Sequence, residues 1–482
     1  MGKKIIIFLE KYEHLIFILI GVAILRIPSL FEPNRYADED IYLTIGMAIK
    51  RGLVLYKDIH DNKPPMIYYT AALAGSVMGF RLILMIWNLI NVVIVYRLSS
   101  WFMNKKWTVL LTTALFGIFS TIPLLEGNIA NGEIFMIMPV ALGVLIFLRN
   151  KKIWWKYLIA GGMFSLGFLF KIPVVFDLIA LLAWFVFYER TFDKKVWLVG
   201  AGFLLPLVLS FLYFYSQGAG EDYFKAALGQ NVGYVSSWEG AKRPFYESGM
   251  FQRATVLGAI SLLVFVLRKK IGSKRSLVLL WVAFAIFGAN LSGRPYPHYL
   301  IQVVTPLAIL VGLLLESKSP SFYLGSLLVI LVFGGSLFWY IYWYYKNMPY
   351  YQDFISYAVG EKNQDGYWKS FGDGVVQNYK VGKFIKMVTK EDDRVYVWGT
   401  EPAIYFIADR LPVGKYTVSY HTLDFNARDE TMVKMRAEAP KIIVMMDNEG
   451  ASFDELRMLL DEKYVLIDRI DHARVYWRLG KK

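Results

Sequence analysis

The sequence predicts a polytopic α-helical membrane protein with a small α/β domain at its C-terminal end. Apolar residues make up 56% of the 482 residues and aromatic residues 17%, whereas ordinary soluble proteins are roughly 45–50% apolar. About eleven apolar runs of span-like length fill residues 1–345. From residue 346 onward the pattern changes to short strands that alternate with amphipathic helices. We therefore expect a membrane domain over residues 1–345 and a separate domain over residues 346–482.

Charge and cysteine content exclude several other classes of protein. The chain has 53 Lys and Arg against 39 Asp and Glu, a net charge of +14. From Asp353 onward the two kinds are balanced at 20 and 21, so the basic surplus lies between the apolar runs, as at the cytoplasmic ends of membrane spans. This distribution argues against a nucleic-acid partner. The absence of Cys excludes disulfides, thiolate metal sites and Cys nucleophiles.

The first apolar run, Leu15–Leu30, follows a short basic tail. A cleaved signal peptide and an uncleaved span both begin in this way. No small-residue cleavage site follows the run and Arg26 interrupts its end, so we favour an uncleaved span. This span places the N-terminus in the cytoplasm and carries Glu32–Pro65 to the extracytoplasmic face of the plasma membrane.

The second run, Met66–Gly79, is too short for an ordinary span. A helix of about 14 residues measures ~21 Å, whereas the hydrocarbon core is ~30 Å thick. If the run crossed the membrane, Asn104–Lys106 would lie outside and every later basic cluster would change sides. If it lies in the interface, those clusters all fall in the cytoplasm, and Tyr68 and Tyr69 suit the headgroup level. We therefore expect interfacial helices in the first outer loop.

The remaining runs predict further spans, which bring the total to about eleven. The two runs that meet at Lys171–Pro173 are both short for a span. An odd number of spans leaves the C-terminal domain outside the cell. The predicted spans are Arg81–Phe102, Trp107–Leu125, Ile134–Leu148, Trp154–Phe170, Pro173–Tyr188, Val196–Tyr215, Phe251–Leu267, Leu277–Leu291, Tyr299–Leu315 and Phe322–Tyr344.

The tail shows the mixed pattern of a small α/β layer domain. It contains no glycine-rich phosphate loop, so we expect a supporting or acceptor-docking role. The predicted helices are Val375–Thr389, Glu401–Ala408, Ala427–Ala437 and Ser452–Glu462, and the predicted strands are Arg394–Gly399, Lys441–Met446, Tyr464–Arg469 and Ala473–Arg478.

Three consecutive carboxylates, Asp38, Glu39 and Asp40, stand in the first outer loop. Neighbouring like charges repel one another and raise at least one pKa. The structural explanation is that Asp38 or Asp40 caps a helix over Ile41–Arg51, whose first turn favours negative charge. The functional explanation is a general base for an acceptor hydroxyl. Both explanations stay open at this level.

Other polar residues fall on the same outer face. Arg294, His298 and Tyr299 stand at the mouth of a late span and could bind a phosphate, or the cation could simply snorkel at the interface. Ionisable residues within spans are costly and indicate function. The remaining polar residues of this face are Glu126, Asn128, Asn131 and Glu133 in the second outer loop, and Lys171 and Asp177 near the proline break.

Carboxylates and cations gathered at one membrane face suit transfer of a group from a membrane-bound phosphate. A carboxylate acts as base on the acceptor, and cations stabilise the phosphate that leaves. This reasoning predicts that the acidic triplet and the cluster around His298 face a shared pocket at the outer leaflet. The residues themselves do not identify the group that is transferred.

A resemblance to a known family gives a sharper expectation. The first outer loop is similar to that of the GT-C membrane glycosyltransferases, nearest to the protein-mannosyltransferase and aminoarabinose-transferase branch (glycosyltransferase families 39 and 83). The residues that carry the resemblance in this loop are Asp38-Glu39-x-x-Tyr42, Gly52, Tyr56, Asp58, Asp61 and Lys63-Pro64-Pro65. Weaker similarities lie at Gly293-Arg294, His298-Tyr299-Leu300 and Pro306, and in the tail at Val395–Gly399, Pro402, Tyr405 and Arg410.

The resemblance implies the GT-C fold, a polyprenyl-phosphate-linked sugar as donor and the lipid bilayer as the environment. It places the catalytic candidate on Asp38, with Glu39 beside it. Lys63 and Tyr299 are implied to contact the donor phosphate, and an acidic residue in the second outer loop, Glu126 or Glu133, to hold the acceptor. We add Arg294, His298 and Lys171 to the phosphate group, and Asn131, Asp61 and His60 to the acceptor group.

The expected reaction is an inverting transfer to a hydroxyl or amine-type group of a glycan, lipid or protein, with Asp38 as base. No cofactor is required, although Asp38, Glu39 and Asp40 could hold a divalent cation, as in more distant oligosaccharyl transferases of this fold. The chain lacks the inserted domain of eukaryotic protein mannosyltransferases, which makes a protein acceptor less expected. The alternative function is a flippase or transporter of a lipid-linked sugar, but such proteins often contain repeated halves, and none is evident in the sequence.

Overall fold

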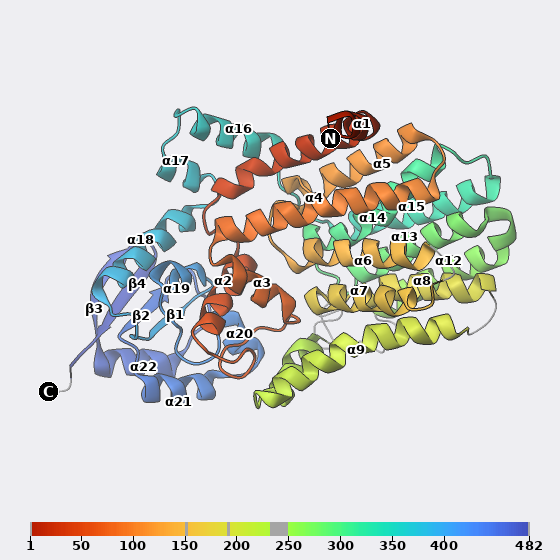
Figure 1. The fold of residues 1–482 in the computed structure, drawn as a ribbon. Helices are drawn as coiled ribbons and strands as arrows, with labels where there is room; N and C mark the ends of the chain where they lie inside the picture. The colour runs from red at the N-terminus through yellow and green to blue at the C-terminus, as the bar shows by residue number, and fades with distance from the viewer. Residues whose placement is uncertain (1, 150–152, 190–192, 232–248, 481–482) are drawn as a thin grey trace. The chain divides into compact units, whose positions relative to one another are not determined.

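The structure is a computed structural model that describes residues 2–149, 153–189, 193–231 and 249–480. The chain forms two compact units (Figure 1). Unit 1 comprises residues 1–29, 81–213 and 229–347, and unit 2 comprises residues 30–80, 214–228 and 348–482. The tail part of unit 2 begins close to the predicted boundary at residue 345, but unit 2 also contains the first outer loop.

Unit 1 is a bundle of apolar helices that run side by side (Figure 1). Within the described part of the chain, six helices are long and apolar enough to cross a bilayer. The protein is therefore a multi-pass membrane protein. The helices are α1 (Gly2–Arg26), α4 (Val77–Phe102), α5 (Lys106–Phe119), α6 (Gly132–Leu148), α7 (Lys156–Phe170), α8 (Val174–Glu189), α9 (Lys194–Ser216), α12 (Gly249–Ile271), α13 (Ser273–Ala289), α14 (Ile301–Leu314) and α15 (Pro320–Tyr340), with short turns η1 (Ile27–Phe31), η2 (Pro123–Leu125) and η6 (Pro297–Leu300).

Helix ends differ from the predicted spans where the backbone forces a turn. The run predicted as one interfacial helix over Met66–Gly79 is α3 (Met66–Ala74) followed by the start of α4, because Gly75 adopts a left-handed conformation with φ 62° and ends α3. The span predicted to reach Leu125 ends at Phe119. The break predicted at Lys171–Pro173 is confirmed, since α7 ends at Phe170 and α8 begins at Val174. The total of eleven spans stays a prediction.

Helices α7 and α9 approach each other so closely that only glycine fits at two positions. A Cβ atom on Gly161 would lie 2.1 Å from the carbonyl oxygen of Val199, and one on Gly202 would lie 2.0 Å from that of Leu158. Small residues of this kind let the backbones of membrane helices come into contact.

Two fully buried arginines hold the ends of helices in unit 1. Arg26, which interrupts the first apolar run, donates from Nη2 to the carbonyl oxygens of Ser120 at 2.7 Å and Gly127 at 2.9 Å. Arg81 donates from Nη1 to the carbonyl oxygen of Ser29 at 3.0 Å. Arg26 thereby fixes the second outer loop, which carries several of the predicted site residues.

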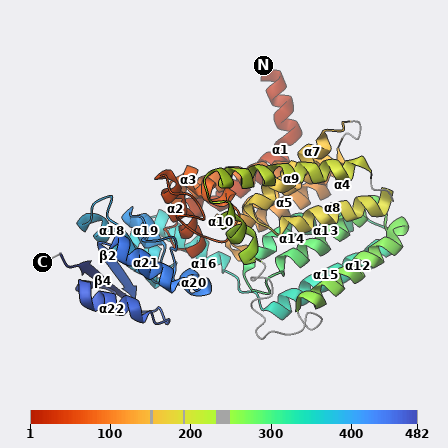
Figure 2. The same cartoon turned by 90° about the horizontal axis from the view of Figure 1, so that it is seen from below.

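The tail of unit 2 contains a four-stranded sheet with helices on both faces (Figure 2). The strand order is β1-β2-β4-β3, in which β1 and β2 are parallel and the other neighbours are antiparallel. All four predicted strands and four predicted helices of the tail are present. The elements are α16 (Asn347–Ala358), α17 (Gln364–Lys369), α18 (Asp373–Val388), β1 (Val395–Trp398), α19 (Ala403–Ala408), α20 (Ser419–Asp424), α21 (Arg428–Glu438), β2 (Ile442–Met446), α22 (Asp454–Lys463), β3 (Tyr464–Ile470) and β4 (Ala473–Arg478).

Alternation along the strands builds two hydrophobic cores, because successive side chains point to opposite faces. On one face, Val395 and Val397 of β1 pack with α18 and α19. On the other face, Tyr396 and Trp398 pack with α21 and α22. The sheet is thus covered on both sides, which explains why β1 and β2 are buried along their whole length.

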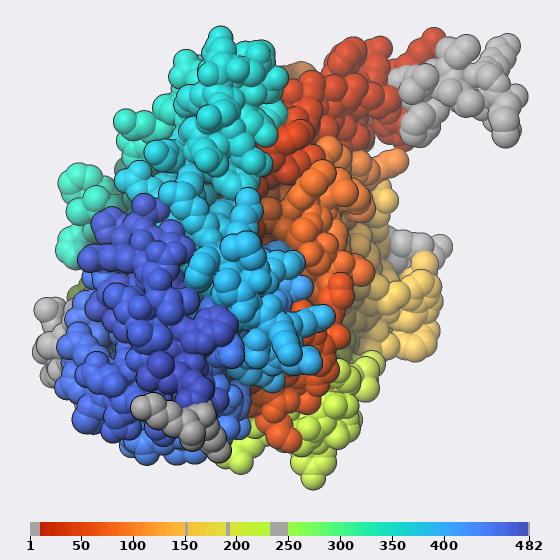
Figure 3. Space-filling view, turned by 90° about the vertical axis from the view of Figure 1, so that its left-hand side faces the viewer, coloured from red at the N-terminus to blue at the C-terminus, as the bar shows by residue number. Residues whose placement is uncertain are grey.

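The first outer loop packs against the tail within unit 2. It forms α2 (Ala37–Lys50) and α3, and residues 214–228 add α10 (Gly220–Phe224) and η3 (Lys225–Gly229). The Thr44 hydroxyl donates to the carbonyl oxygen of Pro402 at 3.1 Å, and Arg51 pairs with Asp409 at 2.6 Å. In the space-filling view the orange-red surface of this loop adjoins the blue surface of the tail (Figure 3).

Candidate functional site

The predicted base and the predicted phosphate-binding lysine lie together in unit 2. The Nζ atom of Lys63 is 3.5 Å from Oδ1 of Asp38 and 3.4 Å from Oδ2 of Asp61, and it lies 5.2 Å from the ring centroid of Tyr42. Asp38 projects from the first turn of α2, where the helix dipole favours a negative charge. We call Asp38, Asp61, Lys63 and His421 the Lys63 cluster.

Asp61 is fully buried and remains ionised because the Lys63 ammonium and hydrogen bonds stabilise its charge. Burial raises the pKa of its carboxyl, but Lys63 and His421 outweigh this effect, and together with the hydrogen bond from the Asn62 backbone they lower the pKa to about 2. Burial in turn lowers the pKa of His421 to about 4, although Asp61 opposes this change. At neutral pH the cluster therefore contains an ionised Asp61 and a neutral imidazole.

Two buried tyrosines hold the backbone around Lys63. The Tyr56 hydroxyl donates to the carbonyl oxygen of Lys63 at 2.8 Å, and the Lys63 backbone N–H donates to the Tyr68 hydroxyl at 3.1 Å. Tyr68 also hydrogen-bonds the Asp61 carboxylate. Tyr56 has φ 72°, an unfavourable conformation for a residue of its size, and such conformations persist where surrounding contacts fix them.

The three consecutive carboxylates do not point into one site. Asp38 is partly exposed and faces Lys63, Glu39 is fully buried, and Asp40 accepts a hydrogen bond from Asn34 at 2.5 Å. Neither Asp38 nor Asp40 caps α2, because Tyr36 occupies the N-cap position without a side-chain hydrogen bond. Among the described residues no three His, Asp or Glu side chains are arranged to hold a metal ion. The divalent cation at Asp38, Glu39 and Asp40 stays a prediction.

His60, predicted to bind the acceptor, lies in an aromatic environment. Its ring centroid is 5.1 Å from that of Phe425, 5.4 Å from that of Tyr416 and 6.3 Å from that of His421. Its backbone N–H donates to the carbonyl oxygen of Lys415 at 2.8 Å. These contacts join the first outer loop to the tail. A structural role therefore explains the presence of His60 as well as a role in acceptor binding does.

A second group of predicted residues meets in unit 1, near the start of α6, the end of α7 and the start of α14. The Nδ1 atom of His298 contacts Oε2 of Glu126, and its Nε2 atom lies 4.0 Å from Oε1 of Glu133. Lys171 pairs with the same oxygen of Glu133 at 2.9 Å and lies 5.6 Å from the ring centroid of Tyr299. We call these five residues the His298 cluster. Its cations are already paired with carboxylates, an arrangement that the sequence did not reveal.

The other predicted residues of unit 1 flank the His298 cluster. Arg294 is half-buried four residues before His298, and its backbone N–H donates to the Ser292 hydroxyl at 3.3 Å. Asn131 is buried at the N-cap of α6, and neither atom of its side-chain amide has a hydrogen-bond partner in the described part of the chain. Buried polar groups without partners are rare and suggest a bound water or ligand.

Asp177 forms a packing contact within the helix bundle. Its carboxylate accepts hydrogen bonds from Trp281 at 2.6 Å and from Gln302 at 2.7 Å. Gln302 also donates to the carbonyl oxygen of Pro173 at 3.0 Å. The contact ties α8 to α13 and α14 and holds the proline break next to the His298 cluster, so a structural role explains this ionisable residue.

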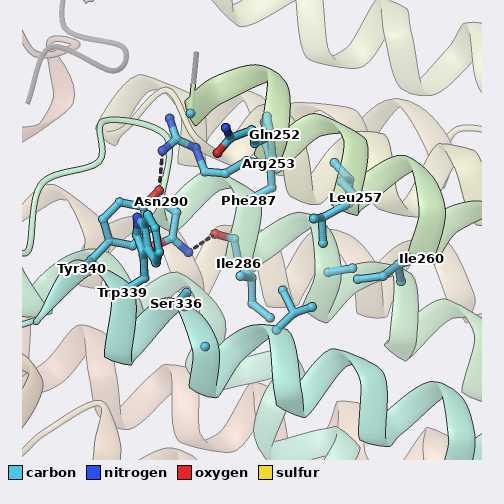
Figure 4. A pocket seen from close by; sticks show the side chains of 15 residues that line it. Gln252, Arg253, Leu257, Ile260, Ile286, Phe287, Asn290, Ser336, Trp339 and Tyr340 are labelled. Atoms are coloured by element: carbon cyan, nitrogen blue, oxygen red, sulfur yellow. Dashed lines mark hydrogen bonds between the residues drawn. The ribbon is translucent and has the colours of Figure 1, made fainter. Parts of the chain in front are cut away.

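An apolar groove of about 650 Å³ lies between α12, α13 and α15 of unit 1 (Figure 4). Its polar end is formed by Arg253, which bonds the Tyr340 hydroxyl, and by Asn290. Leu257, Ile286 and other apolar side chains line the rest. One charged end and a long apolar wall suit an amphiphile. The sequence analysis did not predict this groove.

The structure thus brings the predicted residues together as two clusters, one in each unit. The Lys63 cluster contains Asp38, Lys63 and Asp61, and the His298 cluster contains Lys171, His298, Tyr299, Glu126 and Glu133. The prediction that the acidic triplet and the His298 group face one pocket concerns both units and stays a prediction. Tyr56 belongs to the predicted motif, but its role beside Lys63 was not predicted. His421, Tyr68 and Arg26 were not predicted as site residues, because only the fold shows their contacts.

Comparisons with known proteins agree with the resemblance seen in the sequence. Residues 62–214 match a model of the family described as dolichyl-phosphate-mannose-protein mannosyltransferase. The matched segment covers about a third of the chain and includes Lys63, the second outer loop and Lys171. No curated protein sequence matches the chain.

Among solved structures, the chain is similar to ArnT from Cupriavidus metallidurans. The form bound to undecaprenyl phosphate is 13% identical with a TM-score of 0.59, over 97% of this chain and 98% of that chain. The apo form is 13% identical with a TM-score of 0.57, over 97% and 99%. An Archaeoglobus fulgidus oligosaccharyltransferase with a tethered acceptor peptide is 12% identical with a TM-score of 0.47, over 91% and 69%. The likeness to ArnT shows the GT-C fold and, with the family match, confirms the predicted resemblance.

Proposed function

We propose that the protein is a glycosyltransferase that moves a sugar from a polyprenyl-phosphate donor to an acceptor at the extracytoplasmic face of the plasma membrane. The observation that carries the proposal is the Lys63 cluster, in which an ammonium group lies between two carboxylates. Lys63 also belongs to the segment that matches the mannosyltransferase family. An ammonium group suits a donor phosphate, and the adjacent carboxylate suits a base for the acceptor.

The proposed reaction is a single displacement at the anomeric carbon. Asp38 takes the proton of the acceptor hydroxyl or amine as the acceptor atom attacks that carbon. The new glycosidic bond forms while the bond to the phosphate oxygen breaks, and the polyprenyl phosphate leaves with the electron pair. Attack from the opposite side inverts the anomeric configuration. Lys63 stabilises the charge on the leaving phosphate.

Donor binding and base activation are linked through Lys63 in this proposal. Lys63 lies 3.5 Å from Asp38, so a phosphate on the ammonium group competes with Asp38 for the same charge. The carboxylate is then released to accept a proton next to the sugar. Glu39 is fully buried and stays a secondary catalytic candidate. The step is carried by side chains, and we assign no metal ion to it.

The remaining predicted residues keep the roles that the sequence suggests. We propose that Lys171, Arg294, His298 and Tyr299 contribute to phosphate binding. We propose that Glu126, Asn131, Glu133, Asp61 and His60 contribute to acceptor binding. The unpartnered amide of Asn131 supports a polar ligand group at that position.

The groove in unit 1 offers a place for the hydrocarbon of a lipid substrate. Its wall is apolar over most of its length, and Arg253 and Asn290 stand at one end. A polyprenyl chain with an anionic head has the same division of polarity. The ArnT structure that contains undecaprenyl phosphate shares the fold, which is consistent with a lipid-phosphate substrate here.

Deletion of the gene, followed by mass analysis of lipid-linked sugars and envelope glycans, tests this function. We expect one lipid-linked sugar to accumulate and the same sugar to disappear from a surface glycan, lipid or protein. Complementation with Asp38→Asn should restore less than about one hundredth of the transfer rate, because general-base assistance typically contributes ~10²–10⁴-fold. Asp373→Asn is the matched control, since Asp373, like Asp38, lies in the first turn of a helix of unit 2 but is exposed away from the Lys63 cluster's ion pairs.

Three outcomes would contradict the proposal. Unchanged glycans after deletion would remove the transferase function, and full complementation by Asp38→Asn would remove the assigned base. Translocation of a lipid-linked sugar by the protein in liposomes, without any transfer product, would establish the alternative function of a flippase.

A further inference from the structure

We infer that His421 of the C-terminal tail is a positioning residue for Lys63 and acts on it through Asp61. The inference rests on the proposed role of Lys63 in binding the donor phosphate. It assigns the tail a part in the reaction, because His421 lies in α20, beyond the first strand of the tail sheet.

Asp61 connects His421 to Lys63 through its two carboxylate oxygens. Oδ1 lies 3.5 Å from Nε2 of His421, and Oδ2 lies 3.4 Å from Nζ of Lys63. An ionised carboxylate only accepts hydrogen bonds, so the proton of the neutral imidazole belongs on Nε2. His421 and Asp61 are both buried, so water does not replace this contact easily.

The backbone fixes the tail segment that carries His421 beside the first outer loop. The carbonyl oxygen of Lys415 accepts from the backbone N–H of His60 at 2.8 Å, and His60 forms an isolated parallel bridge with Tyr416. The His421 ring stacks on Phe425, with centroids 5.4 Å apart. The imidazole is therefore held in place by packing that does not involve Asp61.

Positioning matters here because the Lys63 side chain is long and flexible. A lysine ammonium on its four-carbon stem loses considerable rotamer freedom when it is fixed. Asp61 can fix it only if the carboxylate itself does not rotate, and His421 and Tyr68 hold that carboxylate. Without the imidazole, the buried carboxylate would be free to turn both oxygens toward Lys63. The ammonium would then be neutralised more completely and would bind a phosphate less tightly.

The test uses full-length protein in nanodiscs and undecaprenyl phosphate as the probe. His421→Phe keeps an aromatic ring but removes the polar N–H that faces Asp61 at 3.5 Å, and we expect the affinity to fall about fivefold, as for the loss of one modest polar contact. His421→Gln retains a donor near the Nε2 position and should restore most of the affinity. His472→Phe is the matched control, because His472 is exposed in the same tail.

A double-mutant cycle separates positioning from a loss of folding. Asp61→Asn should change the affinity, and adding His421→Phe should change it no further, since His421 acts on Lys63 only through Asp61. Additive losses, or a His421→Gln variant as weak as His421→Phe, would overturn the inference. So would His421→Phe with the wild-type affinity, provided that Lys63→Ala loses the probe. If the wild-type protein itself does not bind undecaprenyl phosphate, the proposed function fails instead.

Discussion

A buried carboxylate needs compensating charge and polar contacts, and Asp61 receives them from both parts of unit 2. Lys63 comes from the first outer loop and His421 from the tail. Because burial keeps His421 neutral while Asp61 stays ionised, the pair makes the stability of unit 2 depend on pH.

Thermal stability should fall as the pH is lowered from about 6.5 to about 4. In this window an unfolded His421 takes up a proton, whereas the folded residue, with its pKa lowered to about 4, does not. This difference in proton uptake lowers the free energy of unfolding by on the order of 3 kcal/mol between pH 6.5 and pH 4. Asp61 adds a second loss below about pH 3.8, because its folded pKa of about 2 contributes stability only while it is ionised.

The midpoint of thermal unfolding in detergent, measured from pH 7 to pH 4, checks this prediction. His421→Phe should show a weaker pH dependence over that range, since it cannot take up the proton. A variant whose midpoint falls with the wild-type slope would show that another group causes the effect.

Asn131 allows structural and functional roles to be separated. Its buried amide has no partner in the described residues and does not cap α6. Replacing such a group with an apolar one of similar size is neutral or stabilising. We expect Asn131→Leu to keep or raise the unfolding midpoint while it lowers turnover. Loss of stability together with unchanged turnover would assign the amide to folding and not to acceptor binding.

At the scale of the elements, the contact between α7 and α9 depends on glycine. A methyl group on Gly202 would lie 2.0 Å from the carbonyl oxygen of Leu158, whereas one on Gly200 of the same helix would meet nothing within 4 Å. Gly202→Ala forces the helices apart, and a change of this kind typically costs about 1–3 kcal/mol.

The unfolding midpoints of Gly202→Ala and Gly200→Ala in the same detergent test this contact. Only the Gly202 variant should unfold at a lower temperature. Equal midpoints for the two variants would show that α7 and α9 separate without cost.

At the scale of the whole molecule, the residue pattern predicted the helices and strands better than it predicted the contacts between them. The lengths of the apolar runs located most helices of unit 1, and the alternating pattern of the tail located all four of its strands. Gly75 was included in one helix because its left-handed conformation depends on the turn that follows. The fully buried Arg26 interrupted a span in the sequence, but only the fold shows that it holds the second outer loop.

The candidate site was likewise predicted only in part, because the sequence shows local motifs but not long-range contacts. Asp38 and Lys63 belong to one recognisable motif in the first outer loop, so the contact between them could be predicted. His421 lies more than three hundred residues away, and no spacing rule connects it to Asp61. Pairing of Lys171 with Glu133 was also hidden, because it depends on how α6 and α7 pack. Long-range ion pairs follow from tertiary structure and not from local pattern.

Equilibrium binding of undecaprenyl phosphate to the full-length protein in nanodiscs tests the central claim, that Lys63 holds the donor phosphate. Lys63→Ala should bind at least about tenfold more weakly, because it removes a charge-assisted contact worth about 1.5–3 kcal/mol. Lys57→Ala, an exposed lysine of the same loop, should bind like the wild type. Equal affinities for the wild type and Lys63→Ala would contradict the account.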